Sequence, residues 1–285
     1  MFEVKVICDS VGPSGKRLTT ITATYPRFIH SEVLTHRDRE RNSASSRAIP
    51  WPKMQAMIQE TPVIPIRWGS EQKGMQTGSE IGNPEEATRI WLEARDNALA
   101  SAQKLADLGV HKSLVNRLTE PFMWITVVMS ATEWKNFFRL RCHPDAEIHF
   151  QRIATMIREA LDKSTPVNLP EGGWHRPFMT DYDEQELRRK GYLHDGLRDA
   201  MNRVSVARVA RVSYLTHEGR RDIDKDMELF ERLVGGSGFG HWSPHGNIAR
   251  AVNDPSYRSG PFFGWHQFRK DYPNEYADVQ HDWGC

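Results

Sequence analysis

The sequence predicts a mixed α+β (α/β mixed) fold in which an antiparallel sheet packs against helices. Two alternating, β-branched segments at residues 2–8 and 18–25 flank the turn-forming run Gly-Pro-Ser-Gly at residues 12–15, which is the pattern of a β-hairpin. A third extended segment, residues 124–129, is also rich in β-branched residues. Between and after these segments, apolar residues recur every three or four positions, which predicts several amphipathic helices.

Composition excludes several classes of protein. The 285 residues are 39% hydrophobic, enough to pack one large domain or two small ones. The net charge of +1 gives no overall support for non-specific nucleic-acid binding. Three scattered cysteines do not make a disulfide framework, and no apolar run approaches membrane length. We therefore expect a cytoplasmic protein without a membrane partner.

After the hairpin, Pro26 suits the first turn of a helix over residues 26–34, which would bring His36 and Arg37 to its end. The following loop, residues 35–47, holds four arginines, one histidine, one asparagine and three serines, so it cannot be core. Guanidinium groups match planar oxyanions, and small hydroxyls beside backbone N–H groups match phosphate oxygens. Composition alone favours a solvated loop or an arm that touches nucleic acid non-specifically.

The middle of the chain is predicted to begin with irregular structure. Residues 53–82 contain four glycines and form either part of a pocket wall or a plain surface insertion. Asn83 is a helix cap, followed by proline and two acids, and it opens a long helix that Gly109 ends. A short helix over residues 111–119 is expected to end before Pro121.

The second half is predicted to be mainly helical. A Ser-x-x-Glu capping box at residues 130–133 opens one helix, and residues 145–163 form the next. Residues 164–180 are rich in proline and glycine and are predicted to be a linker. We divide the chain into a core at residues 1–165 and, at residues 166–285, a linker and helical block that completes the same fold. Helices in that block are expected at residues 183–190, 196–212 and 222–234.

The arginine-rich loop resembles the signature of the flavin-dependent thymidylate synthases. That signature runs Arg-His-Arg, three or four variable residues, then Asn-Glu-x-Ser-x-Arg. The residues that match at this spacing are His36, Arg37, Asn42, Ser45 and Arg47. Thr35 stands in place of the first Arg, Ser43 in place of the Glu, and Glu32 where the family commonly has Gln.

A second block resembles the same family. Residues 134–141, Trp-Lys-Asn-Phe-Phe-Arg-Leu-Arg, match its Leu-x-Asn-Phe-x-x-Leu-Arg, with Asn136 and Arg141 at corresponding positions. Arg117 precedes Leu-Thr-Glu-Pro much as an arginine does in the family's Ala-Arg-x-x-Leu-Pro, with one residue inserted. Without the resemblance, residues 134–141 are an amphipathic helix with exposed basic residues.

A third block covers residues 207–247. Ala-Arg-Val-Ser-Tyr at residues 210–214 and Gly-His-Trp-Ser-Pro at residues 240–244 match the family's Ala-Arg-x-Ser-Tyr and Gly-His-x-Ser-Pro. The usual Phe-Glu-His that follows is here His-Gly-Asn, with Gly246 in place of the Glu. In most members this block comes first. The chain therefore resembles a circularly permuted, phage-like member with the thymidylate synthase-complementing-protein-like fold.

The resemblance implies the reductive methylation of dUMP to dTMP. Methylenetetrahydrofolate would supply the carbon and reduced FAD the hydride, with NADPH regenerating the flavin. The family is a homotetramer with active sites shared between subunits, and no metal is implied. Arg141 would contact the pyrimidine and stabilise its enolate. The implied substrate-binding residues are Ser45, Ser46, Arg47, Arg117, Arg141 and Glu32. The implied flavin-binding residues are His36, Arg37, Asn42, Asn136, His241 and Ser243.

Departures from the family pattern leave alternatives open. They lie at Glu32, Thr35, Ser43 and Gly246. One alternative is flavin-dependent modification of another pyrimidine nucleotide, such as hydroxymethylation. Another is a relative that binds the nucleotide without catalysis, and a third is a nucleic-acid-binding protein that uses the Arg/Ser loop. Arg39 and Arg41 are the candidates to replace the arginine missing at position 35.

Overall fold

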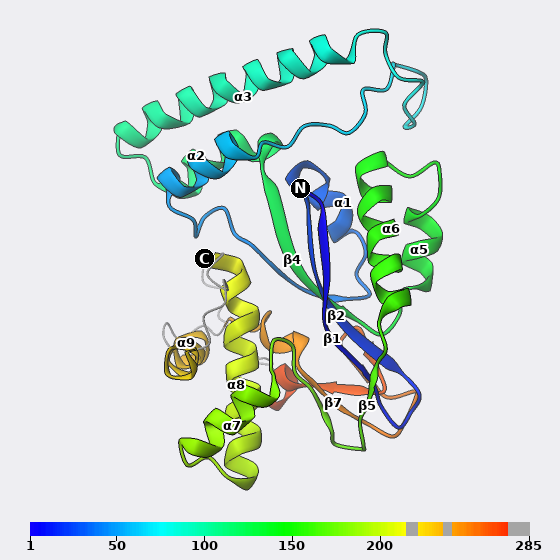
Figure 1. Cartoon of the computed structure of the whole chain (residues 1–285), viewed down its shortest axis with the longest axis vertical. Coiled ribbons are helices and arrows are strands. Elements are labelled where there is room, and N and C mark those ends of the chain that lie inside the picture. The colour runs from blue at the N-terminus through cyan, green and yellow to red at the C-terminus, as the bar shows by residue number, and fades with distance from the viewer. Residues whose placement is uncertain (215–221, 236–240, 273–285) are drawn as a thin grey trace, which may run out of the picture.

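The computed structural model describes residues 1–214, 222–235 and 241–272, and its fold is mixed α+β as predicted (Figure 1). A five-stranded sheet in the order β3-β4-β2-β1-β5 lies between helices on both faces. Its pairs are antiparallel, apart from a two-residue parallel pairing of β5 with β1. The strands are β1 (Glu3–Val11), β2 (Arg17–Pro26), β3 (Glu40–Ser43), β4 (Trp124–Ala131) and β5 (Val167–Asn168).

Three helices cover one face of the sheet (Figure 1). They are α1 (His30–Leu34), α5 (Lys135–Arg141) and α6 (Ile148–Lys163). Alternate residues of β2 and β4, such as Ile21 and Val127, meet Phe150 and Ile157 of α6 in the largest apolar cluster. Burying each such side chain contributes about 1.5–3 kcal/mol, so this face anchors the fold.

The opposite face carries the helical block. Its helices are α7 (Asp181–Arg189), α8 (His194–Arg211) and α9 (Ile223–Gly235). Val128, on the other side of β4, packs against Val206 and Val209 of α8 and Phe230 of α9. Two small sheets complete this end of the molecule. They are formed by β6 (Trp174–His175), β7 (Ala249–Ala251) and β10 (Trp265–Gln267), and by β8 (Arg258–Ser259) with β9 (Phe262–Phe263).

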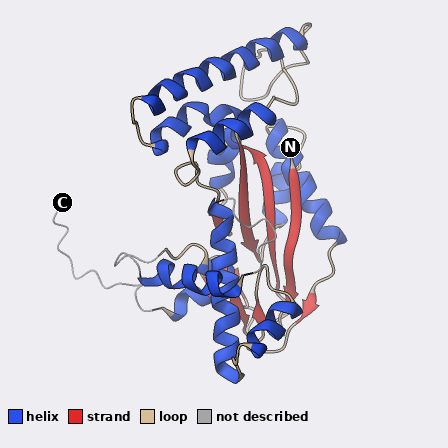
Figure 2. Cartoon of the chain, turned by 60° about the vertical axis from the view of Figure 1, so that its left-hand side comes forward, coloured by secondary structure: helices blue, strands red, loops and turns tan. Residues whose placement is uncertain are grey.

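A third group of helices lies beyond one end of the sheet, as Figures 1 and 2 both show. It contains α2 (Trp51–Glu60), α3 (Pro84–Asp107), α4 (Lys112–Val115) and a 3-10 helix (Asn116–Phe122). Among the described residues, no helix has the length and apolar character needed to cross a bilayer.

The structure corrects several expected elements. Part of the segment expected to be irregular forms α2, because the proline at position 52 lies in the first turn, where it costs no hydrogen bond. Part of the predicted loop is the edge strand β3, which pairs with β4. Ser130 does not cap a helix, because it lies in β4 and bonds Thr20 and Asn247, and α5 begins only at Lys135.

Two further boundaries differ from expectation. The 3-10 helix after α4 continues through Pro121 to Phe122. The predicted linker contains β5 and β6, and β5 adds to the main sheet. Arg17 of β2 also donates hydrogen bonds to the carbonyls of Leu161 and Ser164. The division of the chain near residue 165 stays a prediction, and the pairing of β5 with β1 joins its two sides.

A buried ion-pair network joins the helices of the C-terminal block. Arg208 of α8 donates both Nη groups to the Asp183 carboxylate at 2.8 Å and its Nε to Asp226 at 2.9 Å. Arg211 donates to the other oxygen of Asp226 at 2.7 Å. Both carboxylates are fully buried, so neither has water as an alternative partner.

We predict that Arg208→Met lowers the free energy of unfolding by about 3–5 kcal/mol, because it leaves a buried carboxylate without its cation. Arg198→Met is the matched control. Arg198 lies on the same helix, but its side chain is 56% exposed and pairs with the exposed Asp195, so the loss should be about 0–1 kcal/mol. Urea denaturation measures both values. Equal losses in the two variants would contradict the role given to the network.

Candidate functional site

A cleft of about 580 Å³ lies beside the edge strand β3. This size falls within the range of about 300–1,000 Å³ that is usual for small-molecule sites. Segments far apart in the sequence form its walls. Two of the three blocks of the family resemblance contribute, the motif loop and the block at residues 207–247, whereas residues 134–141 do not line it. Arg41 and Ser43 of β3 line it, as do Ser45 and Arg47 just after that strand. The other walls include His111 and Ser113 at the start of α4, Ser213 after α8, and His241 and Ser243.

Asn42 holds these walls together. Its Nδ2 donates to the carbonyl of Val209 at 2.8 Å and to the Ser213 hydroxyl at 3.0 Å, and its Oδ1 accepts from the Ser243 hydroxyl at 3.3 Å. The backbone N–H of Ser45 donates to the carbonyl of Ser213 at 3.0 Å. Asn42 is buried, so its amide mainly fixes the position of the first and third motif blocks.

The charge of the cleft favours anions. Arg41 and Arg47 both line it, and no acidic residue does within the described part of the chain. Arg41 is held in place because its Nη1 donates to the carbonyls of Leu34 and His36, at 2.9 and 3.1 Å. Arg47 is exposed at the cleft. Two guanidinium groups beside serine hydroxyls can bind a phosphate group.

Ser46 lies on the other side of the same loop. Its side chain is buried, and its hydroxyl donates to Glu120 at 3.4 Å. It therefore does not line the cleft, although its neighbours Ser45 and Arg47 do. Its part in substrate binding stays a prediction.

His36 and Arg141 meet each other outside this cleft. Arg141 Nε donates to His36 Nε2 at 2.8 Å, and its guanidinium lies 4.5 Å from the ring centre of Phe150. The rings of Phe137 and Phe150 both approach His36 edge-on. Burial, helped by the nearby Arg39 and Arg141 cations, lowers the pKa of His36 to about 4. A neutral imidazole thus orients a fixed cation.

Glu32 lies near this pair. Its carboxylate is half-buried, and burial, with the nearby Glu147, raises the pKa of Glu32, while Arg141 opposes the shift. Three other expected site residues are exposed and do not line the cleft of their own chain. They are Arg37, Arg117 and Asn136. Their roles stay predictions, because within one chain the cleft contains only part of the expected set.

Gly246 is a departure from the family pattern that the packing explains. A Cβ atom on it would lie 2.7 Å from the carboxyl carbon of Glu40. Glu40 is held there by Gln267, whose Nε2 donates to it at 2.9 Å. A carboxylate from β3 therefore fills the space beside residue 246, where the family has a glutamate.

The arginine missing at position 35 has one candidate replacement in the cleft. Arg39 is buried and bonded to Asp38, and its guanidinium lies 4.8 and 4.2 Å from the ring centres of Trp134 and Phe137. Packed in this way, it cannot bind a ligand. Arg41 does line the cleft, so it is the residue able to take that place.

Sequence reasoning missed residues that support the site. Ser243 is positioned by Asn247, whose Nδ2 donates to its carbonyl at 3.0 Å. Asn247 in turn accepts from Ser130 at 2.8 Å, and Ser130 bonds Thr20 at 2.6 Å. Local sequence carries no signal for such contacts, because they join three distant segments. No sequence signal marked His111 as a cleft residue either, since its segment was expected only to form a short helix.

Metal ligands do not gather in the described ranges. Residues 1–214, 222–235 and 241–272 contain no group of three or more His, Cys, Asp or Glu side chains placed to hold a metal ion. Gly240, the first residue of the Gly-His-x-Ser-Pro match, lies outside the described residues.

Comparisons with known proteins give weak likenesses. No protein-family model and no curated protein matches the chain. A UMP/dUMP methylase PolB from Streptomyces cacaoi, bound with 5-Br UMP, is similar in structure with a TM-score of 0.47 and 14% identity, covering 57% of this chain and 89% of that chain. With 5-Br dUMP bound, the methylase gives a TM-score of 0.44 and 13% identity, covering 57% and 91%. Likeness at this level establishes neither the family nor the activity of this chain.

We predict that His36 keeps a neutral ring at pH 5.5, because its pKa of about 4 lies well below the ordinary 6.5. As the pH falls from 6.5 towards 4, the unfolded chain binds a proton at His36 that the folded chain does not, so the free energy of unfolding falls. Arg141→Met removes a neighbouring cation and should raise the pKa of His36. Arg139→Met, an exposed position on the same helix, should leave it unchanged.

Nitrogen-15 NMR of the histidine rings measures this pKa in each protein. A wild-type His36 that titrates near 6.5, or equal values in the two arginine variants, would contradict the contact.

Proposed function

We propose that the protein binds a pyrimidine nucleotide in the cleft beside β3 and catalyses the flavin-dependent reductive methylation of dUMP to dTMP. One observation carries the proposal. Segments about 170 and 200 residues apart converge there, because Asn42 bonds both Ser213 and Ser243. Each segment matches a separate motif of the flavin-dependent thymidylate synthases, and a chance resemblance gives no reason for the motifs to meet.

The phosphate of the nucleotide would bind at Arg47. Its exposed guanidinium offers a planar pair of donors at the cleft, and the hydroxyl of Ser45 lines the same wall. The backbone N–H of Ser45 already bonds Ser213, so the hydroxyl is the group left for the ligand. Arg41, fixed by two backbone carbonyls, would add a second positive charge.

The residues present fit a flavin in part. Among the expected flavin-binding residues, His241 and Ser243 line the cleft with exposed side chains, and Asn42 lines it with its amide engaged. His36 is buried against Arg141, which leaves it no contact with the cleft. When bound, FAD would supply the hydride, with methylenetetrahydrofolate as the carbon source and NADPH as the reductant.

Arg141 would act on the pyrimidine. Its Nε donates to His36, which leaves its two Nη groups for a ligand. The permanent positive charge of the guanidinium can stabilise negative charge that develops on a pyrimidine oxygen. It does not line the cleft of its own chain. We therefore propose that a second copy of the chain brings Arg141 to the nucleotide, within a homotetramer that shares its active sites.

A nucleotide-binding protein without catalysis is the second candidate. Two observations favour it: the amide of Asn42 is engaged within the protein, and Arg141 does not line the cleft of its own chain. Modification of another pyrimidine nucleotide, such as hydroxymethylation, uses the same cleft and differs from the first proposal in substrate and product.

We predict that the protein releases tritium from 5-tritiated dUMP when methylenetetrahydrofolate, NADPH and FAD are supplied. Arg47→Ala should raise the KM for dUMP roughly 10- to 150-fold, because a hydrogen bond to a charged group contributes about 1.5–3 kcal/mol. Arg152→Ala is the control, since this exposed arginine of α6 does not line the cleft, and its KM should stay within about twofold of wild type.

Binding of dUMP without tritium release would favour the non-catalytic candidate. The same assay with UMP and dCMP, followed by mass analysis of products, separates the substrates. Absence of binding to any of these nucleotides would contradict both candidates.

A further inference from the structure

A second pocket lies behind the motif loop. Residues of this loop alternate between the two spaces: Ser43, Ser45 and Arg47 line the cleft, whereas Ala44 and Ser46 line the second pocket. The pocket has a volume of about 240 Å³ and is bounded by α2, the end of β2 and the start of β4. One layer of backbone therefore separates it from the cleft, and none of the residues that line the cleft lines it.

The walls of this pocket are mainly apolar and adaptable. Four methionines contribute: one at position 1, two from α2 and one just before β4. They are joined by isoleucine and phenylalanine side chains. The apolar lining includes Met1, Met54, Met57, Ile58, Phe122, Met123 and Ile125. Unbranched thioethers adjust to the shape of a flat ring and make favourable contacts with aromatic faces. A wall of this kind suits an aromatic ligand better than a sugar or a phosphate.

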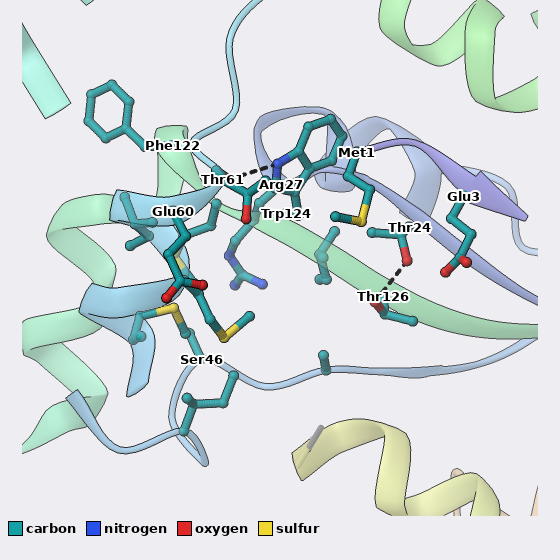
Figure 3. A pocket seen from close by; sticks show the side chains of 17 residues that line it. Met1, Glu3, Thr24, Arg27, Ser46, Glu60, Thr61, Phe122, Trp124 and Thr126 are labelled. Carbon is teal, nitrogen blue, oxygen red and sulfur yellow. Dashed lines mark hydrogen bonds between the residues drawn. The ribbon is translucent and has the colours of Figure 1, made fainter. Parts of the chain in front are cut away.

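One cation lies among these apolar groups. Figure 3 shows the guanidinium of Arg27 within the pocket, and its Nη2 pairs with Glu120 at 2.9 Å. The Nε of Arg27 is buried and has no hydrogen-bond partner in the described part of the chain. A buried donor left unpaired costs about 1–3 kcal/mol. A guanidinium with unused donor capacity is the natural partner for a ligand oxygen.

The rim limits the charge of the ligand. Glu3 and Glu60 are exposed at the pocket, and Glu3 pairs with Lys5 at 2.7 Å. Arg27 already has Glu120 as an ion-pair partner. A phosphate or a second carboxylate would therefore meet net repulsion, while a single acceptor oxygen would not.

We propose that this pocket binds a flat, mainly apolar molecule of one or two rings that carries a single carbonyl or carboxylate oxygen directed at Arg27. The volume of about 240 Å³ is smaller than the usual drug-sized site, which excludes a whole dinucleotide or flavin. The site is separate from the nucleotide cleft, so its test does not depend on the proposed function.

Two probes test the proposal by calorimetry: naphthalene-2-carboxylate and naphthalene-2-carboxamide. Both should bind the wild-type protein, or the carboxylate alone if Arg27 requires a charged oxygen. Met57→Trp should weaken binding at least tenfold, because the indole fills the space between α2 and β4. Met75→Trp is the matched control on a fully exposed methionine and should change the affinity less than twofold. Arg27→Met should also weaken binding at least tenfold.

A measurement on the unchanged chain guards against a variant that fails to fold. With methionine methyl groups labelled with carbon-13, naphthalene-2-carboxylate should shift the signals of Met54, Met57 and Met123 and leave that of Met75 in place. Absence of those shifts would overturn the proposal, as would a folded Met57→Trp or Arg27→Met variant that binds like the wild type. Neither probe carries a pyrimidine or phosphate, so these outcomes leave the dUMP assay unaffected.

Discussion

The site depends on the buried amide of Asn42. A single side chain in the edge strand bonds the end of α8 through Val209 and Ser213 and receives the hydroxyl of Ser243. Because it is buried, losing one of these partners would leave a polar group unpaired at a cost of about 1–3 kcal/mol. The convergence of the motif loop with the C-terminal motif is thus energetically coupled to the fold, so the cleft is formed before any ligand binds.

Further buried polar contacts extend this support into the sheet. Asn247 holds the carbonyl of Ser243 and accepts from Ser130, which bonds Thr20. The ring of His175 extends this series of hydrogen bonds, because its Nε2 lies 2.7 Å from the Thr20 hydroxyl. Burial lowers the pKa of His175 to about 3, so the ring is neutral and can donate with one nitrogen while accepting with the other. Such a network is rigid when every member is paired, which favours a preformed binding wall.

Sequence predicted the fold class because its strongest signals are local. The hairpin and the α3 helix, with its Asn83 cap, rest on neighbouring residues and are confirmed. Strand β3 was missed because its four residues are polar and its pairing with β4 is a long-range contact. Spacing indicated that Asn42, Ser45 and Arg47 act together, and the structure brings them to one cleft. Motif spacing does not say on which face of the sheet Arg141 lies, and the structure places it with His36 outside that cleft.

The central claim is that the motif loop binds the phosphate of a pyrimidine nucleotide. An experimental structure of the protein with dUMP tests it most directly. The account predicts the phosphate within hydrogen-bond distance, about 2.7–3.2 Å, of the Arg47 guanidinium and the Ser45 hydroxyl. It also predicts the pyrimidine in the cleft between β3 and the His241–Ser243 wall. A nucleotide bound elsewhere, or a phosphate with no contact to Arg47 in any copy of the chain, would contradict the account.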